Sequence, residues 1–197
     1  GSVQITHFGG MLPFHFACQY NTVTTAKYLY QLYPESINVA TDIGKYPIHY
    51  AIVGLKKRGD NSEAAVTMVE FLNDCEPNAV SQQFRGKLPM YWACIEATNE
   101  NTRKLNAAFK VLQILYDTYP EAIEDNGVAS DVGEFCAEVK AFLNSQLAYA
   151  RQARDRTLMT TRDDNGQLPL HRALRDNITL GSIKLLVKGN PSAISCN

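Results

Sequence analysis

The stretch Gly44-Lys45-Tyr46-Pro47-Ile48-His49-Tyr50-Ala51 decides how this chain folds, because it is one of four copies of the same phrase. The other copies run over residues 10–17, 86–93 and 166–173. All four keep glycine, proline and alanine in the same register. A phrase that recurs in register is typical of a chain built from structural repeats.

A second phrase, which begins with a proline, follows each octapeptide. Its copies start at Pro34, Pro77, Pro120 and Pro191. Apolar columns precede these prolines by five, six and eight residues: Leu29, Leu72, Leu115 and Leu186; Tyr28, Phe71, Ile114 and Leu185; Ala26, Val69, Leu112 and Ile183. Columns at this spacing, with polar residues between them, predict a helix with one buried face.

The residue types in each unit indicate a turn followed by two helices. The glycine suits a turn that needs positive φ, and the residue before each octapeptide proline is pushed towards extended backbone. That proline can open a helix at its first position, whereas the second proline cannot continue one. A single helix pair cannot bury its own apolar face, so we expect the pairs to stack.

These residues resemble the ankyrin repeat, whose signature is Gly-x-Thr-Pro-Leu-His-x-Ala followed by a leucine-rich second helix. The resemblance covers residues 10–37, 44–80, 86–123 and 166–194. It implies an all-α solenoid of about four helix–loop–helix repeats, forming a single domain over 1–197. Two departures matter. Leu12, Tyr46, Leu88 and Leu168 replace the family's threonine, and Tyr91 replaces its histidine in the third copy.

The repeats are interrupted in two ways. The second and third units carry extra residues, including 55–61 and 98–104, which we expect between their two helices. A larger insertion, 124–161, separates the third and fourth units. Its apolar residues Phe135, Val139, Phe142, Leu143 and Leu147 fall at helical spacing and predict a helix over roughly 132–155 on the side of the stack. A degenerate extra repeat is the competing interpretation.

Composition excludes several classes of protein. The formal net charge is −1, which selects neither nucleic acid nor an anionic membrane. No apolar run is long enough to span a bilayer, and no secretory signal peptide is visible. The 5 cysteines show no CxxC pair and no zinc spacing, so we interpret them as reduced thiols of an intracellular protein, cytoplasmic or nuclear.

The reactive residue types favour structure over chemistry. His15, His49 and His171 occupy equivalent repeat positions, and packed helices lie about 8–10 Å apart, too far for one metal ion to bind such a row. We therefore interpret the histidines as links between turn and helix. Cys18 and Cys94 replace a small buried residue. We expect no catalytic residue, no metal, no cofactor and no small-molecule substrate.

The resemblance implies that one position on each first helix faces an inner groove, and this position holds Phe16, Tyr50, Trp92 and Arg172. Tyr20, Ile95 and Arg175 follow on the same helices, and Ile43, Lys45, Arg85 and Lys87 lie in the turns. Aromatic residues and arginine are enriched at binding hot spots. The sequence thus predicts a scaffold that binds another protein or peptide, although Phe16 and Tyr50 could instead be packing residues.

Two other functions remain open at this point. The chain could be a structural segment of a longer repeat protein, because neither end shows a polar capping unit. Alternatively, the basic residues 56–58 and 103–104, expected in loops, could contact phosphate or nucleic acid. Nearby acidic residues make that case weak, and we expect no membrane insertion.

Overall fold

The computed structural model describes residues 8–59, 61–97, 102–124, 128, 131 and 135–194. Within these ranges every regular element is a helix, which confirms the all-α fold class. The chain divides into two compact units, Gly1–Leu115 and Tyr116–Asn197. The interpretation of residues 1–197 as one domain stays a prediction.

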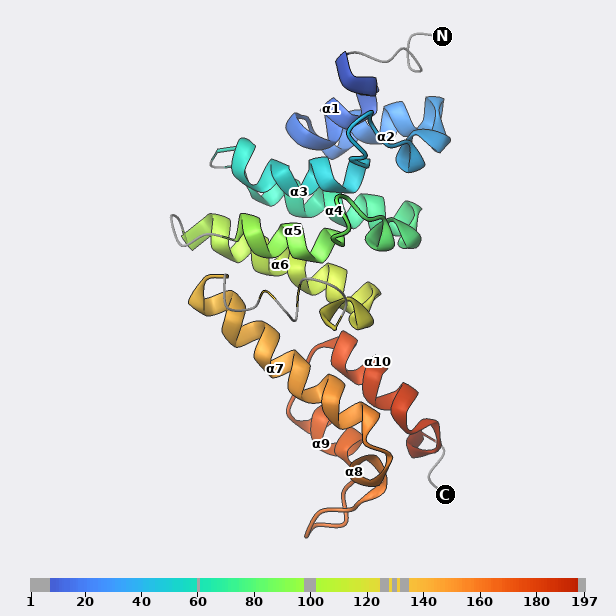
Figure 1. Cartoon of the computed structure of the whole chain (residues 1–197), viewed down its shortest axis with the longest axis vertical. Helices are drawn as coiled ribbons and strands as arrows, with labels where there is room; N and C mark the ends of the chain where they lie inside the picture. The colour runs from blue at the N-terminus through green and yellow to red at the C-terminus, as the bar shows by residue number, and fades with distance from the viewer. Residues whose placement is uncertain are drawn as a thin grey trace. The chain divides into compact units, whose positions relative to one another are not determined.

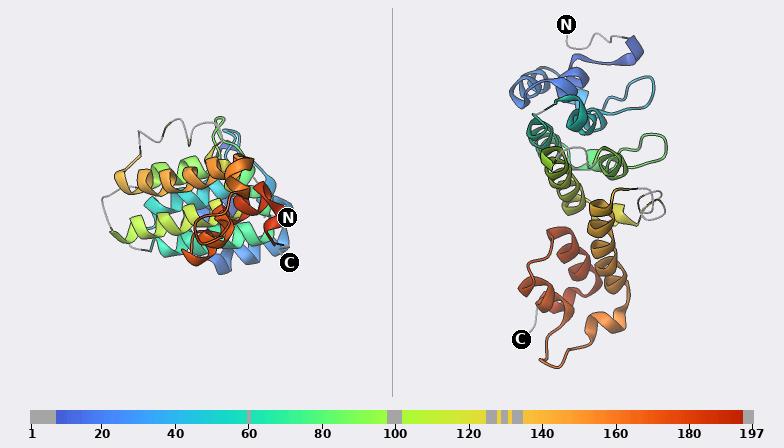
Figure 2. Two further views of the ribbon diagram at one scale, coloured as in Figure 1. Left: turned by 90° about the horizontal axis from the view of Figure 1, so that it is seen from below. Right: turned by 90° about the vertical axis from the view of Figure 1, so that its left-hand side faces the viewer.

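The first unit consists of stacked helix pairs, coloured blue to green in Figure 1. Its elements are η2 (Phe8–Gly10), α1 (Pro13–Tyr20), α2 (Val23–Leu32), η3 (Pro34–Asn38), α3 (Pro47–Lys57), α4 (Glu63–Cys75), η4 (Pro77–Ser81), α5 (Pro89–Glu96) and α6 (Thr102–Thr118), whose end belongs to the second unit. First helices pack on first helices, α1 on α3 and α3 on α5. Figure 2 shows the turns over 39–46 and 82–88 projecting on the same side of this unit.

The octapeptide forms the local structure that its residue types predict. Each copy's proline is the first residue of a helix: α1, α3, α5 and, in the second unit, α9. The residue before it is extended, as at Leu12 with φ −79° and ψ 158°. Gly44 has φ 84° and Gly166 has φ 74°, as the turn requires. The second phrase forms a short 3-10 helix instead of merely stopping the helix before it.

The predicted apolar columns form the core of the stacked pairs. Leu72, Leu115 and Leu186 are 0–1% exposed, and Ala26 and Val69 are 0% exposed. Leu29, Ile114 and Ile183 are half-buried, and Tyr28 is 61% exposed although Phe71 in the same column is 8% exposed.

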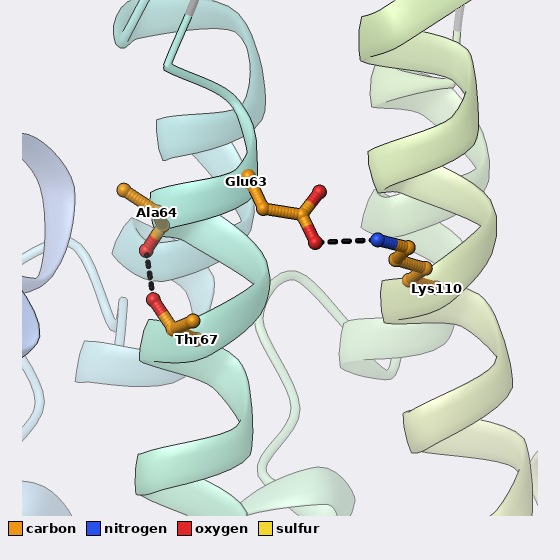
Figure 3. Close-up of polar contacts among 4 residues, drawn as sticks. All are labelled: Glu63, Ala64, Thr67 and Lys110. Atoms are coloured by element: carbon orange, nitrogen blue, oxygen red, sulfur yellow. Dashed lines mark hydrogen bonds and ion pairs between the residues drawn. The ribbon is translucent and has the colours of Figure 1, made fainter.

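Part of the extra residues of the second and third units lengthens helices, contrary to the expected loops. Residues 55–57 form the end of α3, and residues 102–104 form the start of α6. Residues 60 and 98–101 lie outside the described ranges. Helical hydrogen bonding can absorb such insertions because each added residue gains one bond. Figure 3 shows α4 and α6 joined by the ion pair of Glu63 and Lys110, beside the Thr67 hydroxyl, which donates to the Ala64 carbonyl.

The second unit contains the end of α6, η5 (Pro120–Ile123), α7 (Ala137–Arg154), α8 (Arg156–Thr160), α9 (Pro169–Arg175), α10 (Leu180–Gly189) and η7 (Pro191–Ile194). The predicted insertion helix is α7, which begins later than expected; residues 132–134 lie outside the described ranges. Residues 159, 168, 170, 173, 186 and 193 form the core around the last helix pair.

Helix α7 lies beside α10 in this unit. The Ser182 hydroxyl donates to Gln146 Oε1 at 2.6 Å, and the Thr179 hydroxyl donates to the same oxygen at 2.9 Å. The Tyr116 hydroxyl lies 3.0 Å from Ser182 Oγ. Burial, the main cause, raises the pKa of Tyr116 to about 12. The network keeps buried polar groups hydrogen-bonded where the two helices meet.

Candidate interaction surface

The signature histidines tie each turn to its helix. His15 Nδ1 accepts the backbone N–H of Leu12 at 2.9 Å, and His15 Nε2 lies 2.9 Å from the Val39 carbonyl oxygen. His49 Nδ1 accepts from Tyr46 N–H and His171 Nδ1 from Leu168 N–H, each at 3.2 Å. The structural role predicted for the histidines is confirmed. A backbone N–H serves as the donor where the family uses threonine.

Burial keeps these rings neutral in the first unit. It is the main cause that lowers the pKa of His15, and it lowers the pKa of His49 to about 4 with help from the charge of Lys45. A neutral ring can accept through Nδ1 and donate through Nε2, as the geometry at His15 requires. In the third copy, Tyr91 stands beside Trp92 instead, with ring centroids 5.4 Å apart.

The two projecting turns hold cationic side chains over aromatic rings. Lys45 Nζ lies 5.0 Å from the centroid of the Phe84 ring, and the guanidinium carbon of Arg85 lies 5.2 Å from the same centroid. Lys87 Nζ lies 4.6 Å from the Tyr91 ring centroid. Within this range, cations are attracted to the ring faces. The rings therefore hold three cationic heads at the turns of the second and third repeats.

The third-repeat turn is a tight one that positions Arg85. Phe84 and Lys87 exchange backbone hydrogen bonds of 2.9 and 3.1 Å around Arg85, with φ 52°, and Gly86, with φ 69°. Positive φ at both central residues is the geometry of a two-residue hairpin turn. Phe84, only 4% exposed, is the platform beneath both cations. Sequence reasoning missed it, although the aromatic residue stands two positions before the glycine, where Asp42 and Asp164 precede theirs.

Charge interactions connect these turns to the end of α5. Burial lowers the pKa of Lys45, Glu96 counteracts this, and the charge of Arg85 lowers the Lys45 pKa further. Burial raises the pKa of the Glu96 carboxyl, against the opposing charges of Lys56, Lys45 and Lys57. Within the described residues, neither Lys45 nor Arg85 forms an ion pair within 4.0 Å.

Six of the predicted contact residues lie in or beside these turns and on α5. Ile43 is 61% exposed, Ile95 is 42% exposed, and Arg85 is exposed. Lys45, Lys87 and Trp92 are half-buried. We call this set the turn–helix face: Ile43, Lys45, Arg85, Lys87, Trp92 and Ile95.

The other predicted residues lie elsewhere. Tyr50 is 7% exposed and packs edge-on against His15, with ring centroids 5.3 Å apart. It is therefore a packing residue between two repeats, which was the alternative interpretation of this position. Phe16 and Tyr20, 42% and 55% exposed, line a hollow of about 590 Å³ on α1 and α2. Arg172 and Arg175 are exposed in the second unit, where Arg175 contacts Asp176 and Gln167.

The basic run at the end of α3 is partly structural. The Arg58 guanidinium donates to the carbonyl oxygens of Asn21 at 2.5 Å, Cys18 at 2.8 Å and Ala17 at 3.4 Å. These carbonyls end α1, where an arginine satisfies unpaired oxygens and the negative end of the helix dipole. Arg58 therefore holds the first two repeats together. One of the basic residues that could contact phosphate thus already has partners inside the protein.

The two cysteines that occupy equivalent repeat positions are buried. Cys18 and Cys94 are 0% and 1% exposed, and burial raises the pKa of the Cys18 thiol. Among the described residues, no three or more His, Cys, Asp or Glu side chains gather to hold a metal ion. In the same residues, no helix is long and apolar enough to cross a bilayer.

Stacked pairs of turn-linked helices, fixed by buried histidines, define a helical repeat protein. A family model described as ankyrin repeats (many copies) matches residues 1–51. This match supports the resemblance to the ankyrin repeat that the octapeptides carry. No curated protein and no solved structure matched the chain. Ankyrin repeats generally serve as protein–protein interaction modules and are typically not enzymes.

Proposed function

We propose that this chain is a protein-binding module whose turn–helix face binds an acidic, extended segment of a partner protein. The observation that carries the proposal is the placement of Lys45 and Arg85 over one Phe84 ring without an ion pair to a described carboxylate. Burial is the main cause of the lowered pKa of Lys45, and repulsion by the like charge of Arg85 lowers it further. A carboxylate from a partner would relieve that repulsion.

Apolar contacts next to the cations supply the second part of the recognition. Ile43 and Ile95 are exposed, and Trp92 lies against Phe84 at a centroid distance of 5.1 Å. Apolar and aromatic anchors give most of the binding energy in interfaces, whereas charges steer encounter and set specificity. The expected partner segment therefore alternates acidic side chains with a few leucine or phenylalanine side chains.

A fluorescence-polarisation titration tests this with two labelled peptides, one carrying Glu and Leu and the other carrying Gln in place of each Glu. We expect the Glu peptide to bind more tightly, with an affinity that falls as salt rises because the charges are screened. The K45E/R85E double variant should weaken binding at least tenfold. Equal binding of both peptides, or binding insensitive to salt, contradicts the proposal.

A charge-matched control separates the face from net charge. The K140E/R151E double variant changes two cations of α7 in the second unit, the same change in net charge as K45E/R85E, and should leave the affinity within twofold. A single-stranded oligonucleotide in the same assay distinguishes an acidic protein segment from nucleic acid. Tighter binding of the oligonucleotide than of the Glu peptide, lost in K45E/R85E, would replace the proposal with the phosphate-binding alternative. The free thiols of Cys18, Cys75 and Cys136 support an intracellular setting for this function.

A further inference from the structure

The first helix pair exposes an apolar face whose equivalent in the second repeat is covered. Tyr20 is 55% exposed, Tyr28 is 61% exposed and Leu32 is 52% exposed. Beside them, Pro13, Ala17, Thr25 and Leu29 help to line the 590 Å³ hollow. We call Phe16, Tyr20, Tyr28, Leu29 and Leu32 the N-terminal face. A contiguous exposed apolar patch is typical of a surface that contacts another macromolecule or a ligand.

Equivalent positions of the second repeat show what such a face binds. Tyr20 corresponds to Gly54, which is buried, and Tyr28 corresponds to Phe71, which is 8% exposed. Phe71 packs edge-on against Tyr30 of the first repeat, with centroids 5.8 Å apart, and lies under Lys27. The first repeat thus covers this face of the second. The N-terminal face is the continuation of an interface already present inside the unit.

The last helix pair exposes the opposite half of the same interface. Leu174 is 56% exposed and Ile194 is 66% exposed, whereas their counterparts in the first repeat, Cys18 and Ile37, are 0% and 3% exposed. His171 is exposed, although its counterpart His15 is 0% exposed. In the first repeat, His15 packs against Tyr50 of the second repeat, and both α1 and η3 contact α3. We call His171, Leu174 and Ile194 the C-terminal face.

We propose that the N-terminal face of one chain binds the C-terminal face of a second copy, head to tail. The C-terminal face is equivalent to the side of the first repeat that packs on the second, and the N-terminal face is equivalent to the side of the second repeat that packs on the first. The two faces can therefore pack as neighbouring repeats do. Contacts of this kind join different surfaces and therefore add copies in a row instead of closing a two-fold dimer. Burial of Tyr20, Tyr28 and Leu174 removes apolar area from water and favours the association.

Sedimentation velocity over a concentration series tests the proposal with the full chain. We expect the wild-type chain to show an average mass that rises steadily with concentration. The Y20K/Y28K variant removes the N-terminal face, and L174K removes the C-terminal face. Each variant alone should remain monomeric, because the added lysine charges would be buried at the contact. A mixture of the two should form a one-to-one dimer and nothing larger, since one intact pair of faces remains.

The control variant Q31K adds a charge on α2 outside this face, because its counterpart Asp74 is exposed in the second repeat. Q31K should associate like the wild type. Circular dichroism must show the same helical signal in every variant, which separates lost association from lost folding. A wild-type chain that stays monomeric overturns the proposal and leaves the faces to neighbouring repeats of a longer chain. Self-association of either variant alone also overturns it.

Discussion

The two units carry the same octapeptide but assemble their helices differently. In the first unit, first helices pack in chain order, and His15 links one turn to the next through Leu12 and Val39. In the second, α7 lies against α10 through the polar groups of Gln146 and Ser182. The difference teaches that the octapeptide fixes a turn and a helix start, whereas residues outside it decide which helices meet.

Removal of the signature histidine should give the largest difference in stability loss between the two units. We expect His15→Leu to lower the free energy of unfolding of the first unit by about 3 kcal/mol, because the Leu12 N–H and the Val39 carbonyl each lose a partner at about 1–3 kcal/mol. Urea unfolding followed by the fluorescence of Trp92, the single tryptophan, measures it. His171→Leu, at an exposed site, should cost under about 1 kcal/mol by circular dichroism. Equal losses of stability in His15→Leu and His171→Leu would contradict the expectation that the histidine link matters more in the first unit.

A substitution where two helices pack closely should have the second-largest effect, and here the second unit should lose more stability than the first. An ideal Cβ on Gly189 of α10 would lie 2.3 Å from the Ala153 carbonyl oxygen of α7, a backbone atom that cannot move alone. Gly189→Ala should therefore destabilise the second unit by about 2 kcal/mol, despite alanine's better helix propensity. Hydrogen exchange resolved on peptides of α7 and α10 measures this.

Gly54→Ala is the matched variant in the first unit. There the nearest atom, at 2.9 Å, is Nε of the Arg58 side chain, which can shift, and Gln19 O follows at 3.2 Å. We expect a loss below about 1 kcal/mol, since the gain in helix propensity offsets part of the strain. A larger loss at Gly54 than at Gly189 would show that the repeat stack is the more tightly packed region.

Acid should weaken the first unit through its buried histidines. Because the folded pKa of His49, about 4, lies below the unfolded value of 6.5, the unfolded chain binds more protons between these values. Stability is therefore complete above the unfolded pKa and falls as the pH drops towards 4. From pH 7 to pH 5 we expect His49 to contribute a loss of about 2 kcal/mol. Urea midpoints of His49→Gln should show a flatter pH profile; an unchanged slope would contradict this.

Surface ion pairs should give the smallest effects in both units. Glu63 and Lys110 join α4 to α6 in the first unit, with side chains 59% and 56% exposed, and Lys188 contacts Glu121 in the second. Exposed pairs contribute about 0.2–1 kcal/mol. We expect Lys110→Met to lower stability by less than 1 kcal/mol, an effect that about 0.5 M salt should already abolish in the wild type. A loss above about 2 kcal/mol would show that the pair is coupled to packing.

The local structure followed from the residue types alone. Pro47, Gly44 and the apolar residues before Pro77 predicted a helix start, a positive-φ turn and a buried helical face, and the structure has all three. These features depend on contacts within a few residues, so a single sequence contains the information. The structural role of His49 was predictable too, because its partner Tyr46 lies three residues away.

The interaction surface required the tertiary structure, because exposure depends on the neighbouring helix. Phe16 and Tyr50 occupy the same repeat position, yet one is 42% and the other 7% exposed, since only Tyr50 has a repeat packed on it. Likewise, Arg58 reaches α1 and Phe84 receives Lys45 through contacts between repeats. Sequence alone determined the repeat and its helices. Stacking decided which equivalent side chains become core, interface or exposed face, because burial is a property of the assembled neighbours.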